Sequence, residues 1–201
     1  GLIMDGSEAN MDFVRLSSLY WQYDLTAKTA FITAQNINEL ITQAGFAGKI
    51  GILHIDIDGN DYWVWKKIEA VQADVVIMEY NSIFGAKKAW TTPYQADFYR
   101  TKAHFSNLYF GASLVALCEL AKEKGYEFIG TNLHGNNAYF VKKEYAAKFK
   151  ILSAQEGYTL SRFTEARNEA GELSYLRGEE RLKALQGMPI FNVRTGRLEK
   201  I

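Results

Sequence analysis

The chain has 201 residues, of which 48% are apolar, which is enough to bury one substantial core and favours one domain over two. Lys plus Arg and Asp plus Glu each total 23, so no net charge would attract nucleic acid or an anionic membrane surface. The apolar runs are far shorter than the roughly 20 residues that span a bilayer. The single cysteine, Cys118, excludes an internal disulfide and fits a reducing compartment. We therefore expect a cytoplasmic protein that binds neither nucleic acid nor membranes.

The first predicted elements are a strand, a turn and a helix. Residues 2–4 form an apolar strand, Asp5, Gly6 and Ser7 form the turn, and apolar residues then recur at helical spacing as far as Leu19. The strand is already under way at the first residue, which suggests that an upstream piece is missing. A carboxylate at the end of such a strand either binds the hydroxyls of a nucleoside ribose or caps the helix that follows.

A second strand is expected over residues 29–33, followed by a helix over residues 37–44 that ends at Gly45. Asn36 and Glu39 have the spacing of a capping pair at the start of that helix.

The clearest strands come next. Residues 50–55 and 75–78 are continuous apolar runs, and a helix is expected between them over residues 62–70. Continuous rather than alternating apolar strands are typical of a parallel sheet with helices on both faces. The sequence therefore predicts a three-layer α/β sandwich.

An aromatic segment without clear periodicity covers residues 81–110. Long connections of this kind are often functional, so we interpret the segment as an active-site cover. A helix over residues 113–124 then leads to strands at 126–130 and 138–141, which would close the sheet as an antiparallel pair.

The rest of the chain is expected to be an appendage rather than a second domain. It is predicted to hold short charged helical stretches at residues 164–168 and 179–185, a final stretch at 188–193 and a turn at 194–197. The predicted organisation is thus one α/β domain over residues 1–149, incomplete at its N-terminus, with residues 150–201 packed on it.

The strongest functional signal is the run of three carboxylates in residues 56–61, directly after a strand. Asp56 and Asp58 would point the same way if both are in strand geometry, which would either raise the pKa of one of them, as suits proton abstraction, or form a metal site. Glu79 and Asn81 end the next strand and could complete, with Asp56, a site for Mg²⁺ or another divalent cation. His54 shares the sheet face of Asp56 and is either a core residue or a further catalytic group.

The order of these motifs resembles the FkbM-like group of class I methyltransferases, which use S-adenosylmethionine. The resemblance rests mainly on His54-Ile55-Asp56-Ile57-Asp58-Gly59-Asn60-Asp61, on residues 76–81 and on residues 111–126, and it spans most of the chain. It implies a Rossmann-like, mostly parallel sheet closed by an antiparallel pair, with Asp5, Gly6 and Ser7 at the cofactor. It also implies a first strand with a Gly-rich loop, which residues 1–201 lack.

The resemblance implies O-methylation of a small-molecule or glycan hydroxyl, with Asp56, Asp58 and His54 as the catalytic candidates. The chain would then be a truncated fragment of the enzyme, or a binding module that has lost its cofactor site. A phosphohydrolase of the haloacid-dehalogenase type, with Asp56 as nucleophile and Asp58 as general acid, is a further alternative. A homo-oligomer is compatible with each of these readings.

Overall fold

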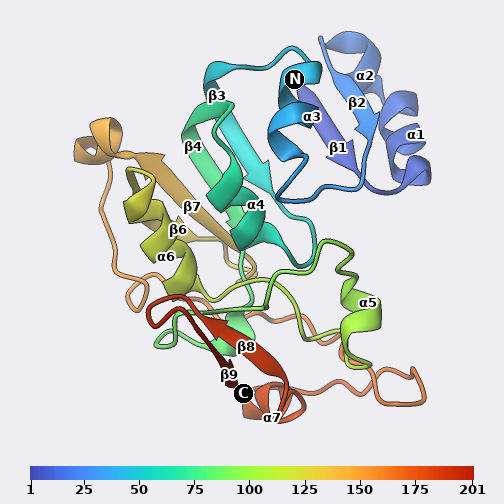
Figure 1. Ribbon diagram of the computed structural model, residues 1–201, viewed down its shortest axis with the longest axis vertical. Coiled ribbons are helices and arrows are strands. Elements are labelled where there is room, and N and C mark those ends of the chain that lie inside the picture. Colours follow the sequence, from blue (N-terminus) through green and yellow to red (C-terminus); the bar gives the residue numbers. More distant parts are fainter.

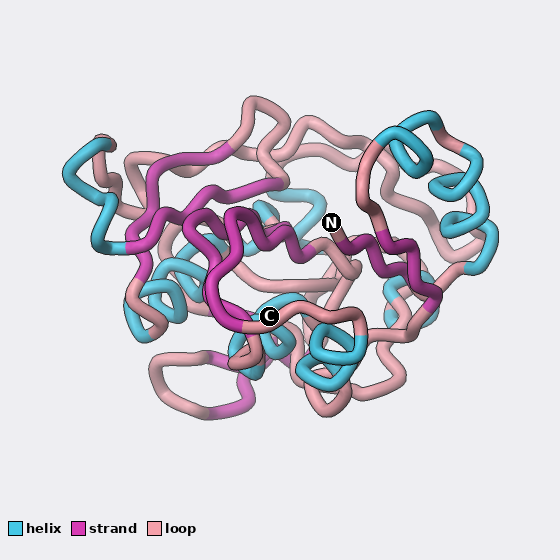
Figure 2. The backbone as a smooth tube through the Cα atoms, turned by 90° about the horizontal axis from the view of Figure 1, so that it is seen from above, coloured by secondary structure: helices cyan, strands magenta, loops and turns pink.

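The computed structural model describes residues 1–201 as an α/β protein of short elements (Figure 1). The strands are β1 (Leu2–Asp5), β2 (Thr26–Thr29), β3 (Gly48–Ile55), β4 (Val71–Glu79), β5 (Trp90–Thr91), β6 (Tyr126–Thr131), β7 (Asn137–Lys142), β8 (Pro189–Asn192) and β9 (Arg197–Lys200). The helices are α1 (Glu8–Leu16), α2 (Ser18–Gln22), α3 (Ile37–Gln43), α4 (Asp61–Lys67), α5 (Arg100–Ala103), α6 (Leu114–Glu123), α7 (Glu179–Lys183) and the 3₁₀ helices η1 (Ser82–Phe84) and η2 (Lys143–Lys148). Loop segments run around these elements (Figure 2).

The strands form three small sheets rather than one. β1 and β2 make a parallel pair, and a four-stranded sheet has the order β3-β4-β7-β6. In that sheet only β3 and β4 are parallel, because β7 runs antiparallel to both of its neighbours. β5, β8 and β9 form a third, antiparallel sheet. The expected closing antiparallel pair is confirmed, but the single, mostly parallel sheet is not present, since parallel pairing is confined to two separate strand pairs.

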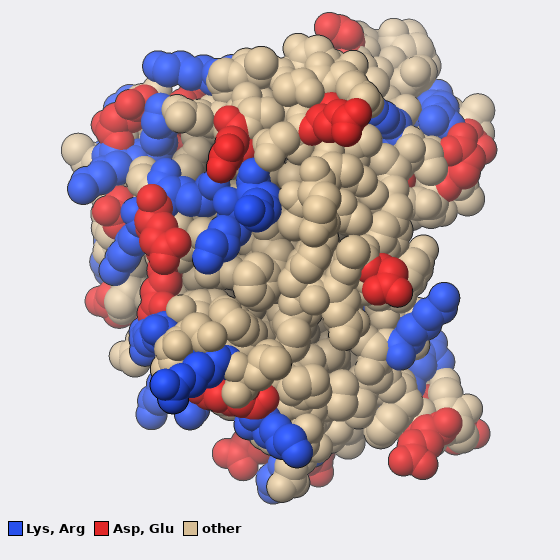
Figure 3. Space-filling view, in the orientation of Figure 1, with Lys and Arg blue, Asp and Glu red and all other residues tan.

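Two strands have an unpaired edge in the middle of the molecule. β1 pairs only with β2, and β3 pairs only with β4. In Figure 1, β1 lies between β2 and β3, so these unpaired edges face the same region. Each of these strands also carries an exposed apolar side chain, with Ile3 38% and Ile52 65% accessible. Figure 3 shows few charged side chains down the centre of this face, whereas Lys and Arg gather toward its left border.

The main core lies between the four-stranded sheet and helices α3, α4 and α6. Its centre includes Trp65, whose ring lies 5.3 Å from that of Phe140. A second, smaller core joins the segment that precedes α6 to the C-terminal segment, through buried residues such as Phe110, Leu185 and Ile190. Residues 150–201 therefore contribute to a core shared with the earlier part of the chain.

Most of the locally predicted elements are confirmed within a few residues. Gly45 and Gly125, with φ of 83° each, end α3 and α6 in the left-handed conformation that favours glycine. The short helix at 179–183 also lies where the sequence predicts it, and the stretch at 188–193 forms β8. None of the helices is both long enough and apolar enough to cross a membrane.

Three local predictions are wrong. The second strand ends at Thr29, because the carbonyl of Phe31 accepts a hydrogen bond from the Asn36 side chain instead of continuing the ladder. Asn36 makes no side-chain cap on α3, since its Oδ1 accepts from Thr33 N at 2.8 Å. Residues 164–168 are not helical. There Asn168 Oδ1 accepts from two later backbone N–H groups, a local alternative to helical hydrogen bonding.

Candidate functional site

A cavity of about 730 Å³ opens where β1 and β3 end, although these strands belong to different sheets. Its walls come from the turn after β1, the segment after β2, the turn after β3 and the start of α5. The residues that line it include Asp5, Gly6, Ser7, Phe31, Ile32, Asp56, Ile57, Asp58, Phe98, Tyr99, Arg100, Thr101 and Glu165. We call it the larger cavity.

Asp5 orders the turn that enters α1. Its Oδ1 accepts from Ser7 N at 2.6 Å and its Oδ2 accepts from Asn10 Nδ2 at 3.1 Å. Ser7, rather than Asp5, is the residue whose side chain caps the helix, by accepting from Asn10 N at 3.4 Å. A carboxylate has about four lone-pair sites, so each Asp5 oxygen retains capacity for a further donor from the cavity.

Asp56 lies directly after β3 and lines the larger cavity. Asp56 is exposed as a residue, but partial burial of its carboxyl raises the pKa above the ordinary value, and the negative charge of Asp58 raises it further. The positive charges of His54 and Arg100 act in the opposite direction. Asp56 is therefore the predicted site residue whose environment is most suited to accepting a proton beside this cavity.

Asp58 takes part in an ion-pair network. It has φ of 57°, and its Oδ1 accepts from Arg100 Nη1 at 2.8 Å. The same guanidinium donates to Glu165 Oε1 at 2.6 Å and to the carbonyl of Asn107 at 2.7 Å. Asp58 thus holds Arg100 in the wall of the cavity, because the two side chains approach each other from turns 42 residues apart.

Asp61 fixes the turn between β3 and α4. It is fully buried in the first turn of α4, where its carboxylate accepts from Ile57 N at 2.8 Å and from Gly59 N at 2.9 Å. Burial raises its pKa to about 6, against the opposing effect of these two hydrogen bonds. Gly59 is required in the turn, since a Cβ there would lie 2.2 Å from the Phe98 ring. The acidic run therefore combines one structural carboxylate with two that line the cavity.

His54 is not brought into either cavity described here. Its side chain is exposed, with Nε2 3.4 Å from Asn137 Oδ1 on β7. It influences Asp56 through charge alone. A catalytic role for His54 stays a prediction that its position does not favour.

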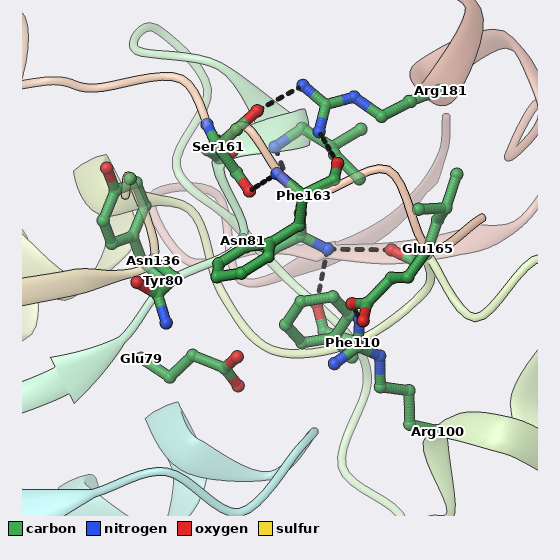
Figure 4. Close-up of a pocket in the computed structure, with 14 residues that line it drawn as sticks. Glu79, Tyr80, Asn81, Arg100, Phe110, Asn136, Ser161, Phe163, Glu165 and Arg181 are labelled. Carbon is green, nitrogen blue, oxygen red and sulfur yellow. Dashed lines mark hydrogen bonds and ion pairs between the residues drawn. The ribbon is translucent and has the colours of Figure 1, made fainter. Parts of the chain in front are cut away.

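A second cavity, of about 190 Å³, lies beside the end of β4 (Figure 4). We call it the smaller cavity. Arg100 and Glu165 line both cavities, and the remaining polar or aromatic lining residues include Glu79, Tyr80, Asn136, Ser161, Phe163 and Arg181. The C-terminal segment therefore forms much of one wall.

Glu79 is the most perturbed acid in this region. Only 8% of it is exposed, and its Oε2 has no hydrogen-bond partner in the protein. Burial raises its pKa well above the ordinary value, and the nearby charges of Asp61, Asp56 and Asp58 raise it further, whereas Arg100 lowers it. Figure 4 shows the carboxylate directed toward Phe110 and Arg100.

Asn81 anchors the following loop. Its Nδ2 donates to the carbonyls of Leu108 and Phe110 at 2.8 and 3.0 Å, and its Oδ1 accepts from Ile83 N at 3.1 Å. No group of three or more His, Cys, Asp and Glu side chains is arranged to hold a metal ion. The divalent-cation site of Asp56, Glu79 and Asn81 stays a prediction that this arrangement does not favour.

No sequence motif identifies several of the residues that line the two cavities. Arg100 lies in the aromatic segment of residues 81–110, and this segment supplies walls of both cavities. Phe163, Glu165 and Arg181 lie in the polar C-terminal segment, where charged residues ordinarily indicate a solvated surface. Only the folded arrangement brings them to the end of β4.

Comparison of the chain with protein-family models, with curated proteins and with solved structures found no significant match.

Proposed function

We propose that the protein is an S-adenosylmethionine-dependent O-methyltransferase that acts on a carbohydrate or other glycan hydroxyl. One observation carries the proposal: Asp5 ends β1 and Asp56 follows β3, each strand belongs to a parallel pair in its own sheet, and both carboxylates line the same cavity of about 730 Å³. Ligands of open α/β folds bind at the carboxyl ends of such strands, and the volume lies within the usual range for small-molecule and cofactor sites. In this proposal Asp5 binds the ribose hydroxyls, and Gly6 and Ser7 approach the cofactor with their backbone.

The arrangement of the strands supports the Rossmann-like form of this proposal. The resemblance to the FkbM-like group implies one further parallel strand with a Gly-rich loop. A strand placed between β1 and β3 would pair with both unpaired edges and join two sheets into one. The proposed cofactor would then lie at the carboxyl end of that strand, between Asp5 and Asp56.

The larger cavity offers the chemistry that methyl transfer to oxygen needs. Bound S-adenosylmethionine would supply an activated methyl group. The protein would have to align the acceptor hydroxyl and remove its proton. The raised pKa of Asp56 makes this carboxylate a better base than an ordinary aspartate, and Asp58 would hold Arg100 against the acceptor.

Isothermal titration with S-adenosylhomocysteine tests the proposal. We expect binding in the micromolar range, and Asp5→Asn should weaken it about tenfold, because an amide retains only one acceptor oxygen for the ribose hydroxyls. Asp24→Asn is the matched control, since Asp24 is exposed and lies outside both cavities.

The alternatives give different results. Absence of binding to the wild-type chain would contradict the methyltransferase proposal and leave a non-catalytic module. Hydrolysis of p-nitrophenyl phosphate that disappears in Asp56→Asn would instead favour the phosphohydrolase.

A further inference from the structure

The smaller cavity has a feature that methyl-donor binding does not explain. Four buried side-chain nitrogen or oxygen atoms have no hydrogen-bond partner in the protein, and two of them, Glu79 Oε2 and Arg181 Nε, belong to residues that line this cavity. Glu79 is 8% and Arg181 4% exposed. Buried polar groups nearly always have partners, so the unpaired oxygen of Glu79, whose carboxylate is directed toward Phe110 and Arg100 in the lining of this cavity (Figure 4), points to a ligand.

We propose that the smaller cavity binds the hydroxyl-bearing end of an uncharged alcohol of about one ring in size, with Glu79 as hydrogen-bond acceptor. A hydroxyl group suits the unpaired Glu79 oxygen, since it can donate one hydrogen bond to it. Alcohol binding in this cavity does not depend on the function proposed above. The assignment of the cavity as the methyl-acceptor site does rest on that function.

The charges around the cavity favour an uncharged ligand. Arg100 directs its terminal nitrogens to Asp58 and Glu165, so its charge is already paired. Arg181 directs its terminal nitrogens to the carbonyls of Ser161 and Phe163, at 3.1 and 3.4 Å, so these nitrogens are already occupied. It therefore lacks the free two-pronged face that binds carboxylates and phosphates. The raised pKa of Glu79 favours its neutral form, so neither Glu79 nor the paired Arg100 and Glu165 offers a free charge to a ligand.

The size and the apolar lining favour a single ring. A cavity of about 150 Å³ is enough for a six-membered ring such as benzene, and this one measures about 190 Å³. Leu108, Phe110 and Phe163 supply apolar surface beside the polar atoms. One side of Phe110 is covered by the guanidinium of Arg100, 3.8 Å from the ring centre, whereas Phe163 is 48% exposed. A ring with an apolar face would cover Phe163 while its hydroxyls reach Glu79.

The two cavities are neighbours. Arg100 and Glu165 line both, so a ligand in the smaller cavity would lie next to whatever occupies the larger one. This placement is the one required of a methyl acceptor beside a methyl donor.

Saturation-transfer-difference NMR on the whole chain, with and without S-adenosylhomocysteine, tests the inference. The uncharged probes are methyl β-D-glucopyranoside, methyl β-D-galactopyranoside and myo-inositol, and the charged ones are glucuronate and glucosamine. We expect at least one uncharged probe to bind about tenfold more tightly than both charged ones. Glu79→Met should weaken that binding about tenfold, whereas Glu127→Met, which changes a glutamate of the same sheet outside both cavities, should leave it unchanged.

A second measurement separates binding from a structural role. Glu79→Met removes a buried acceptor without a partner, so the melting temperature should rise while binding falls. The inference is overturned if no uncharged probe binds, if a charged probe binds best, or if Glu79→Met binds as the wild type does. Alcohol binding without S-adenosylhomocysteine binding would refute the methyltransferase proposal alone, and the reverse result would refute only this inference.

Discussion

Arg100 and Asp58 form an ion pair of 2.8 Å that joins the turn after β3 to the start of α5, beside both cavities. The Arg100 side chain is 17% exposed and that of Asp58 62%, so solvent screens the pair and its Coulomb energy alone is small. Arg100 contributes more by holding separate segments together, because the same guanidinium also binds Glu165 and the carbonyl of Asn107.

Arg100→Lys should therefore destabilise the protein by about 1–2 kcal/mol, since an ammonium cannot satisfy three acceptors in fixed directions. The free energy of unfolding in urea measures this effect. Arg162→Lys is the control, because Arg162 is exposed and lines neither cavity. If Arg100→Lys lowers the free energy of unfolding by less than about 0.5 kcal/mol, this would contradict a bridging role for the side chain.

Gly59→Ala should lower the melting temperature by several degrees. The added Cβ would lie 2.2 Å from Cδ1 and 2.3 Å from Cε1 of Phe98, and overpacking of this kind costs about 1–3 kcal/mol. Gly51→Ala on β3 provides the comparison, since a Cβ there meets nothing within 4 Å. Thermal unfolding followed by circular dichroism distinguishes the two, and equal melting temperatures would show that the Phe98 contact is not rigid.

Asp61 should make stability depend on pH between about 4 and 6. Its pKa rises from 3.8 in the unfolded chain to about 6 in the folded protein, so the folded state holds the proton more tightly. The stabilisation that this pKa shift gives the folded protein is present in full below pH 4 and is lost as the pH rises through 6.

Asp61→Asn removes this titration and replaces one acceptor oxygen with a donor that faces a backbone N–H group. The variant should have a lower free energy of unfolding than the wild type. This margin between the two proteins should be largest near pH 4 and should shrink toward pH 7. Urea unfolding at a series of pH values measures the margin. A margin that is constant with pH would mean that Asp61 is ionised throughout the range.

Local structure was predictable where neighbouring residues determine it. The apolar runs that became β3 and β4, and glycines such as Gly45 and Gly125 at helix ends, identify elements without knowledge of the fold. The turn over residues 56–61 was also recognisable, because a glycine among carboxylates has few other uses.

Long-range arrangement was not predictable from the same signals. Asn81 looked like a metal ligand, but its amide is satisfied by carbonyls 27 and 29 residues later. Similarly, nothing near Arg181 indicates that its guanidinium lies in the wall of a cavity beside Glu79. The division into three sheets depends on which strand edges meet, and an apolar run does not specify its partner.

The central claim is that the larger cavity, between the ends of β1 and β3, is a cofactor site. Chemical-shift mapping of the ¹⁵N-labelled chain with S-adenosylhomocysteine tests it most directly, because it reports where the ligand binds as well as whether it does. We predict that the largest amide shifts fall on Asp5, Ser7, Phe31 and Asp56, which line that cavity. Shifts confined to α7, β8 and β9, or no shifts at saturating ligand, would contradict the claim.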